Sequence, residues 1–209
     1  MAIDTYEFGA VNTRLETYEW DDIWWDHAPD EKARRILIIG DSISRGYRRA
    51  VSKAGDLDFF VDGIATSKAA DSATFRTLID YFSCSGLSYD AVFFNNGLHG
   101  WHIDDELFGE LFLDLAKYIK EKFAPKKLVL VNTTPARKSQ SIDIFDERNE
   151  RVKLRNSAIR AAADSLGAEL IDFYSLIENR PELYTQDGIH LIDEGYALLA
   201  GEIIKIAEK

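Results

Sequence analysis

The sequence predicts a single α/β domain in which a five-stranded, mainly parallel sheet lies between two layers of helices. Short apolar runs alternate along the chain with longer amphipathic segments, and turn residues separate them. Helices that return between parallel strands cover both faces of a sheet. No internal repeat or interdomain linker interrupts this alternation. We therefore expect an aromatic-rich N-terminal arm, residues 1–33, packed on one domain spanning residues 34–209.

The expected strands are short apolar runs bounded by charged or turn-forming residues. The first, residues 36–39, is an Ile-Leu-Ile-Ile run between Arg35 and Gly40. An unbroken run of this kind is typical of a strand buried on both faces. We expect the second strand to end before Gly63. The later strands are expected at residues 58–62, 90–95, 127–132 and 169–172.

The expected helices carry apolar residues at helical spacing. In the third of them, the predicted buried stripe consists of Leu107, Leu111, Leu115 and Ile119. Gly167 follows the fourth, where a left-handed residue commonly ends a helix. The helices are expected at residues 45–54, 74–82, 104–121 and 146–166 and from residue 193 onward. The polar stretch between them, residues 133–145, is predicted to be a long loop bordering an active site.

Composition excludes several classes of partner. A net charge of −11 leaves no basic stripe for nucleic acid and disfavours anionic membrane surfaces. The sequence has no apolar run long enough to span a membrane and no apolar signal segment, so we expect a soluble, cytoplasmic protein. Cys84 is the only cysteine and is predicted to be a small buried residue rather than a nucleophile. The oligomeric state is left open.

The N-terminal arm holds three of the four tryptophans, Trp20, Trp24 and Trp25, interspersed with carboxylates. Flat aromatic faces suit sugar rings, so the arm is a candidate substrate platform. Alternatively, these side chains pack against the domain and hold the arm in place, or they form a subunit contact. We favour the second interpretation.

Ser42 directly follows the first predicted strand and precedes a predicted helix. Open α/β sheets bind ligands at the carboxyl ends of their strands. The N–H groups at a helix N-terminus favour developing negative charge, which suits a nucleophile that forms an oxyanion. A serine in this position is also a common helix cap, and the stretch alone does not separate these roles.

Asp187 and His190 supply the partners that a nucleophilic serine needs. Three residues apart in a turn, the carboxylate can bind one imidazole nitrogen while the other nitrogen faces Ser42. A second histidine group, His99 and His102 beside two aspartates, has a spacing that permits a metal site. It has no third well-placed histidine and no cysteine, so we expect no metal.

These motifs together resemble the SGNH/GDSL hydrolase pattern over about residues 34–207. Residues 40–42 read Gly-Asp-Ser, Gly63 follows the second predicted strand, and residues 187–190 read Asp-Gly-Ile-His before the last helix. The resemblance implies a flavodoxin-like sheet of the SGNH hydrolase type. It also implies that Ser42 is the nucleophile, His190 the general base and acid, and Asp187 its orienting carboxylate. The backbone N–H groups of Ser42 and Gly63 would form two oxyanion donors.

The third oxyanion donor is where the sequence departs from the family. The family reads Gly-x-Asn-Asp after the third strand, whereas residues 97–100 read Gly-Leu-His-Gly. Aligning the glycines puts His99 at the asparagine position, and a neutral imidazole N–H can donate to an oxyanion. Asn96 could supply an amide instead. We favour His99.

The predicted function is a serine esterase that forms an acyl-enzyme and uses no cofactor. The expected substrate is a small-molecule or carbohydrate ester, preferably an acetyl group on a carbohydrate, by similarity to deacetylating members of the family. A lipase or thioesterase acting on longer acyl chains is the alternative. A catalytically weak carbohydrate-binding relative is a third hypothesis, kept open by the departure at His99.

Overall fold

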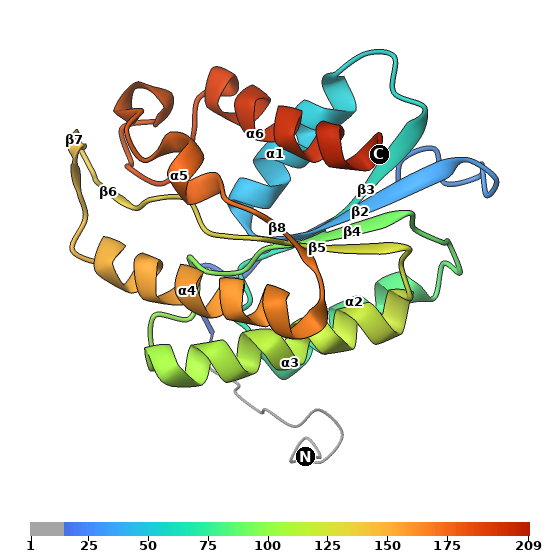
Figure 1. The fold of residues 1–209 in the computed structure, drawn as a ribbon, viewed down its shortest axis with the longest axis horizontal. Helices are drawn as coiled ribbons and strands as arrows, with labels where there is room; N and C mark the ends of the chain where they lie inside the picture. The colour runs from blue at the N-terminus through green and yellow to red at the C-terminus, as the bar shows by residue number, and fades with distance from the viewer. Residues whose placement is uncertain (1–14) are drawn as a thin grey trace.

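The computed structural model describes residues 15–209, which form a six-stranded sheet between two helical layers (Figure 1). The strand order is β1-β3-β2-β4-β5-β8. Five neighbouring strands run parallel, and β1 pairs antiparallel with β3 at the edge. The strands are β1 Asp21–Trp24, β2 Arg34–Gly40, β3 Phe59–Thr66, β4 Ala91–Phe94, β5 Lys127–Val131 and β8 Glu169–Ile171. The predicted three-layer α/β fold is confirmed, with β1 as an additional strand inside the arm.

The helices divide between the two faces of the sheet (Figure 1). One face carries α1 Ser42–Lys53, α5 Phe173–Ile177 and α6 Asp193–Ala207; the other carries α2 Ala73–Ser83, α3 Asp105–Phe123 and α4 Asn149–Leu166. Side chains of β2 alternate between the two cores: Ile36 and Ile38 face the first, Leu37 and Ile39 the second. This explains why β2 reads as an unbroken apolar run.

One predicted strand end and one predicted loop were wrong, and one predicted buried stripe was right only in part. β3 continues through Gly63 to Thr66 instead of ending before the glycine. Residues 133–145 are not one loop, since β6 Arg137–Lys138 and β7 Ser141–Phe145 form a small hairpin within them. On α3, Leu115 and Ile119 are buried as predicted, but Leu107 is exposed, and Phe108 and Phe112 are buried instead.

Short elements lead from β8 to the last helix. After α5, a single 3-10 turn covers Pro181–Leu183, and α6 then begins at Asp193, as the sequence predicted. Gly167 ends α4 in the left-handed conformation, with φ of 59°, which also agrees with the prediction. Among the described helices, none is long and apolar enough to cross a membrane.

Candidate active site

Ser42 lies at the topological switch point of the sheet. The chain crosses from β2 to β3 on one side, while β4 lies on the other side of β2. Open α/β sheets bind ligands beyond the strand ends at such a point. β2 ends at Gly40, where a Cβ would lie 2.1 Å from the Ser44 Oγ, so the close approach of the next helix requires glycine. Ser42 is the first residue of that helix, α1.

Asp41, not Ser42, caps the helix. Its Oδ1 accepts hydrogen bonds from the N–H groups of Ile43, at 2.9 Å, and Ser44, at 3.3 Å. Burial raises the pKa of Asp41, and the nearby His99 and these N–H donors oppose that shift. The capping role proposed for Ser42 is therefore wrong, and its hydroxyl is available for other contacts.

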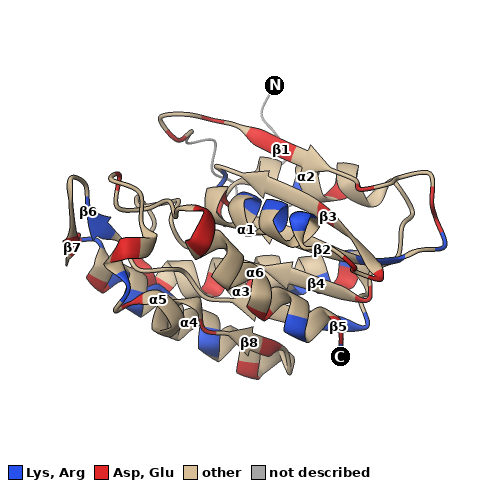
Figure 2. Ribbon diagram, turned by 90° about the horizontal axis from the view of Figure 1, so that it is seen from above, with Lys and Arg blue, Asp and Glu red and all other residues tan. Residues whose placement is uncertain are grey.

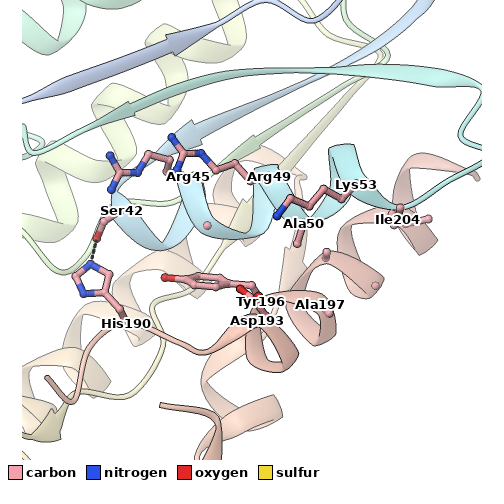
Figure 3. Close-up of a pocket in the computed structure, with 14 residues that line it drawn as sticks. Ser42, Arg45, Arg49, Ala50, Lys53, His190, Asp193, Tyr196, Ala197 and Ile204 are labelled. Atoms are coloured by element: carbon pink, nitrogen blue, oxygen red, sulfur yellow. Dashed lines mark hydrogen bonds between the residues drawn. The ribbon is translucent and has the colours of Figure 1, made fainter. Parts of the chain in front are cut away.

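Ser42, His190 and Asp187 form one hydrogen-bonded chain. The Ser42 Oγ lies 2.9 Å from the His190 Nε2 (Figure 3), and the His190 Nδ1 lies 2.7 Å from the Asp187 Oδ2. The side chains of His190 and Asp187 are 43% and 50% exposed, so the pair is open to solvent. Each imidazole nitrogen thus has its own partner, which is the arrangement that a general base acting on serine needs.

Asp187 is fixed by its own turn as well as by His190. Its Oδ1 accepts hydrogen bonds from the N–H groups of Ile189, at 2.8 Å, and His190, at 2.9 Å, and from the Thr185 hydroxyl, at 2.9 Å. Partial burial alone would raise the pKa of Asp187. The hydrogen bonds from His190, Ile189 and Thr185 outweigh burial and lower the pKa to about 2. Asp187 is therefore ionised throughout the neutral range.

The hairpin that the sequence did not predict holds this turn in place. The Arg137 N–H donates to the Gly188 carbonyl at 2.8 Å. Gly188 has φ of 75°, and a Cβ there would lie 2.2 Å from the Arg137 carbonyl oxygen. Both the backbone conformation and the close contact require glycine. The Asp-Gly-Ile-His sequence thus packs against β6, a contact that no local sequence signal indicates.

His99 and Asn96 have different surroundings. A hollow of about 360 Å³ is lined by Ser42, His99 and His190 together with residues of the arm. Asn96 is fully buried outside that lining, and its Nδ2 donates to the Lys68 carbonyl at 2.9 Å. The structure therefore brings His99, and not Asn96, to the same hollow as the serine and its base.

Gly63 is not placed where the sequence predicted. It lies within β3, where it pairs with Ile38 of β2 and Trp24 of β1. A Cβ at Gly63 would lie 2.3 Å from the Arg48 Cδ, so the glycine makes room for an arginine of α1. Its assignment as a strand-end oxyanion donor is therefore corrected.

The first N–H groups after β3 are also committed to other acceptors. Ser67 donates to the Trp20 carbonyl at 3.1 Å, and Lys68 donates to the Thr66 Oγ1 at 3.2 Å. Neither is directed at the serine in this structure.

A buried arginine that sequence reasoning missed supports the loop carrying His99. The Arg155 guanidinium donates to the carbonyls of Gly97, His99 and Gly100 at 2.7–2.9 Å. Its side chain is fully buried on α4, and Trp101 lies over it at 4.4 Å. Burial lowers the pKa of Arg155 to about 10. In the sequence it is simply one of several arginines in a predicted helix, with no signal of its role.

The arm contributes directly to the hollow at His99. The Glu16 Oε1 accepts the Gly100 N–H at 2.8 Å and lies 3.8 Å from the His99 Nδ1. Tyr18 and Trp20 line the hollow, and the Arg45 guanidinium carbon lies 4.8 Å from the Trp20 ring. The arm's residues 1–14 lie outside the described part of the chain.

The other tryptophans of the arm have structural contacts. Trp25 stacks on Phe82 with ring centroids 4.4 Å apart, and Trp24 lies under Arg48 within β1. In the described arm, Trp25 therefore packs against the domain, while Trp20 lines the hollow at Ser42.

A groove between α1 and α6 also reaches Ser42. It has a volume of about 640 Å³ and shares Ser42, Arg45 and His190 with the hollow at His99 (Figure 3). Two concave regions therefore meet at the serine.

His102 and Cys84 lie outside the linings of the groove and the hollow at Ser42. Within residues 15–209, no group of three or more His, Cys, Asp or Glu side chains is arranged to hold a metal ion. His102 is instead paired with Asp71, with the Nε2 2.7 Å from the Oδ2. Cys84 is exposed at the end of α2, so its predicted burial was wrong.

Comparisons with known proteins bear on the fold. No protein-family model matches the sequence, and no curated protein matches it. Among solved structures, a GDSL-like lipase from Bacteroides thetaiotaomicron has 20% identity and a TM-score of 0.67, covering 87% of this chain and 91% of that one. A member of the lipolytic G-D-S-L family from Veillonella parvula has 18% identity and a TM-score of 0.64, covering 83% and 98%.

An acetyl xylan esterase has 21% identity and a TM-score of 0.63, covering 82% of this chain and 98% of that one. At such identities the similarity is one of backbone architecture. The strand order, with the serine at its switch point, and these matches lead to one conclusion: the chain has the fold of the GDSL-like lipases and esterases.

Proposed function

We propose that this protein is an SGNH/GDSL-type carboxylic ester hydrolase that acts through a covalent acyl-enzyme. The observation that carries the proposal is the hydrogen-bonded chain of Ser42, His190 and Asp187, with contacts of 2.9 and 2.7 Å. Residues more than 140 positions apart in the sequence are aligned in the order that nucleophilic catalysis needs. The fold shared with lipases and esterases supports the same reaction class.

In this mechanism the Ser42 Oγ attacks the ester carbonyl while the His190 Nε2 takes its proton. Asp187 stays ionised, holds the imidazole in the required tautomer and stabilises the imidazolium. His190 then gives the proton to the leaving alcohol. A water molecule, deprotonated by the same nitrogen, attacks the acyl-enzyme and releases the acid and Ser42.

The oxyanion would face the backbone N–H of Ser42 and the imidazole of His99. His99 lines the hollow that contains Ser42, whereas the Asn96 amide is bound to the Lys68 carbonyl. One oxyanion donor typically lowers the barrier of acyl transfer by about 3–4 kcal/mol. His99 would take the role of the family's asparagine.

The preferred substrate is a small acyl ester, most simply an acetyl group on a carbohydrate. The hollow at His99 is bounded by Thr17, Tyr18 and Trp20 of the arm, and an aromatic wall suits a sugar ring. The similarity to an acetyl xylan esterase points the same way. The aligned triad favours turnover over carbohydrate binding alone.

A second candidate, hydrolysis of longer acyl esters, is favoured by the groove between α1 and α6. Small apolar side chains, including Ala50, Ala197 and Ala200, line much of it. An acyl chain could lie along such a surface.

A panel of nitrophenyl acetate, butyrate and octanoate tests the proposal. We expect acetate to give the highest kcat/KM and Ser42→Ala to lower kcat by at least about 10³-fold, because the nucleophile is lost. A preference for octanoate would select the longer-chain candidate. Absence of hydrolysis, or equal activity of Ser42→Ala, would contradict the esterase function.

A further inference from the structure

We propose that the groove between α1 and α6 binds the alcohol portion of the substrate, and that this portion is an anionic chain. The inference rests on the proposed esterase function and adds a substrate class to it. Carboxylates or phosphates repeated along an oligomer, as in an acidic oligosaccharide, are the chemistry that the groove fits. The lining cations, the shape of the groove and its position relative to His190 carry the inference.

α1 is a cationic helix in an acidic protein. The whole chain has 36 acidic and 25 basic residues, yet α1 has three arginines, one lysine and no acidic residue (Figure 2). Three of its cations, Arg45, Arg49 and Lys53, are four residues apart and therefore share one face of the helix, spaced about 6 Å along its axis. They form a regular row along the groove.

The side chains of this row point toward the serine. Figure 3 shows Arg45, Arg49 and Lys53 leaning along α1 toward its N-terminus, where Ser42 and His190 lie. Helical side chains lean this way because the Cα–Cβ bond tilts toward the N-terminus. The positive charge is therefore directed at the end of the groove where chemistry would occur.

Local carboxylates leave part of this charge uncompensated. Asp22 of β1 pairs with Arg49 at 3.0 Å and with Arg45 at 3.8 Å, so one carboxylate serves two guanidinium groups. Lys53 forms no ion pair with any residue in the described part of the chain. Asp193 is the single acidic residue among the described residues that line the groove.

The shape of the groove suits an extended ligand. From Ser42 to Lys53 it follows the whole of α1, roughly 16 Å at 1.5 Å per residue. Its floor is built of small residues, and a Cβ at Gly46 would lie 2.1 Å from the Tyr196 ring. Because Gly46 has no side chain, the Tyr196 ring packs directly against α1 at this point.

The position of His190 assigns the groove to the alcohol rather than the acyl group. His190 lines the groove, and its Nε2 is the atom that would protonate the leaving alcohol. His99, which would face the carbonyl oxygen, lines the smaller hollow and not the groove. The small acyl group and the sugar ring that carries it then occupy the hollow of about 360 Å³, and the rest of the alcohol extends along the cationic row.

Binding of oligomers that contain no ester tests the inference independently of catalysis. Calorimetry with pentagalacturonate, linear pentapolyphosphate and neutral xylopentaose compares two anionic chains with an uncharged one. We expect an anionic chain to bind and to compete with nitrophenyl acetate. Its affinity should fall when the NaCl concentration rises from about 20 to about 300 mM. The tighter of the two anions identifies the charged group.

The double variant Arg49→Gln/Lys53→Gln has a matched control. Arg49→Gln/Lys53→Gln should weaken binding of the anionic chain about 3- to 20-fold, because each exposed ion pair contributes modestly and the two contributions to the binding free energy add. Lys117→Gln/Lys153→Gln removes the same charge from α3 and α4 on the other face of the sheet and should leave binding unchanged. Equal binding of xylopentaose, or equal loss in both double variants, would overturn the inference. Failure to hydrolyse nitrophenyl acetate while an anionic chain still binds would count against the esterase function instead.

Discussion

Two serines near the start of α1 have different environments, and the difference defines the candidate nucleophile. Ser44 is buried behind Gly40, and its Oγ accepts a hydrogen bond from the Tyr47 hydroxyl at 3.0 Å. Ser42 is partly exposed and contacts the His190 imidazole. Position on the helix, rather than residue type, therefore decides which hydroxyl can react. Ser44 is the natural control for every experiment on Ser42.

The depressed pKa of Asp187 predicts how its contribution to stability depends on pH. Its folded pKa is about 2, below the ordinary 3.8, so the stabilising contribution is complete above about pH 4 and is lost as the pH falls toward 2. Denaturant unfolding of the wild type and Asp187→Asn at pH 7, 4 and 2.5 measures this. The difference in unfolding free energy should persist at the first two values and shrink at the third. A difference that stays constant down to pH 2.5 would contradict the assigned pKa.

The oxyanion assignment predicts opposite effects for two neighbouring substitutions. His99→Ala should lower kcat for nitrophenyl acetate about 10²–10³-fold with little change in stability, because it removes a transition-state donor from a partly exposed position. Asn96→Ala should instead destabilise the fold, since it removes a buried bond to the Lys68 carbonyl. Steady-state kinetics and thermal unfolding measure the two effects. Full activity of His99→Ala, with activity lost in a folded Asn96→Ala, would reverse the assignment.

At the scale of elements, the candidate site depends on supports that lie behind it. The β6–β7 hairpin holds the turn of Asp187 and His190 through the contact between Arg137 and Gly188. On the other side, α4 holds the loop of His99 through Arg155. Both supports are arginines, and each binds a carbonyl group of a loop that borders the candidate site: Arg137 through its backbone N–H and Arg155 through its side chain. The geometry at Ser42 therefore results from contacts among segments far apart in the sequence.

Arg155→Lys tests whether α4 positions His99. Lysine keeps the charge but cannot bind three carbonyls with a planar fork, so we expect kcat to fall about tenfold or more while KM changes less than twofold. When His99→Ala is already present, adding Arg155→Lys should change kcat very little, because both substitutions act through the same donor, the His99 imidazole. A purely structural role would lower the melting temperature but leave kcat of the folded enzyme unchanged in either background.

At the scale of the whole molecule, the sheet was predictable because its signals are local. β2 is an unbroken apolar run that alternates between two cores, and the α helices carry apolar faces that cover it. The order of parallel strands then brings the ends of β2 and β4 to one edge. The contacts among Ser42, His190 and Asp187 could be expected because Gly-Asp-Ser and Asp-Gly-Ile-His occur in the order and approximate spacing of the pattern that the sequence resembles.

The end of β3 could not be predicted because Gly63, directly after the charged Asp62, looked like the boundary of the strand. Asp62 is fully buried and binds the Arg35 guanidinium at 2.9 Å and the Tyr89 hydroxyl at 3.0 Å. These partners come from other strands and loops, so nothing near Asp62 in sequence reveals them. Burial with such partners lets a carboxylate occupy a central strand and allows the strand to continue past Gly63.

β1 and the hairpin were missed for a related reason. β1 reads Asp-Asp-Ile-Trp and becomes a strand by pairing with β3 from Asp21 to Trp24. The hairpin mixes polar and apolar residues and turns through Gln140 with φ of 61°. Edge elements of this kind are stabilised by tertiary pairing more than by their own composition. The arm and the hairpin that border the site therefore became visible only in the folded chain.

The most direct test of the proposed catalytic serine is mass-spectrometric mapping of a fluorophosphonate adduct. The probe reacts with a serine only when an adjacent base activates it. We predict that the wild type and Ser44→Ala carry one adduct on Ser42, that Ser42→Ala carries none, and that His190→Ala is labelled at least about 100-fold more slowly. An unlabelled wild type, or labelling that survives Ser42→Ala, would contradict nucleophilic catalysis by this serine.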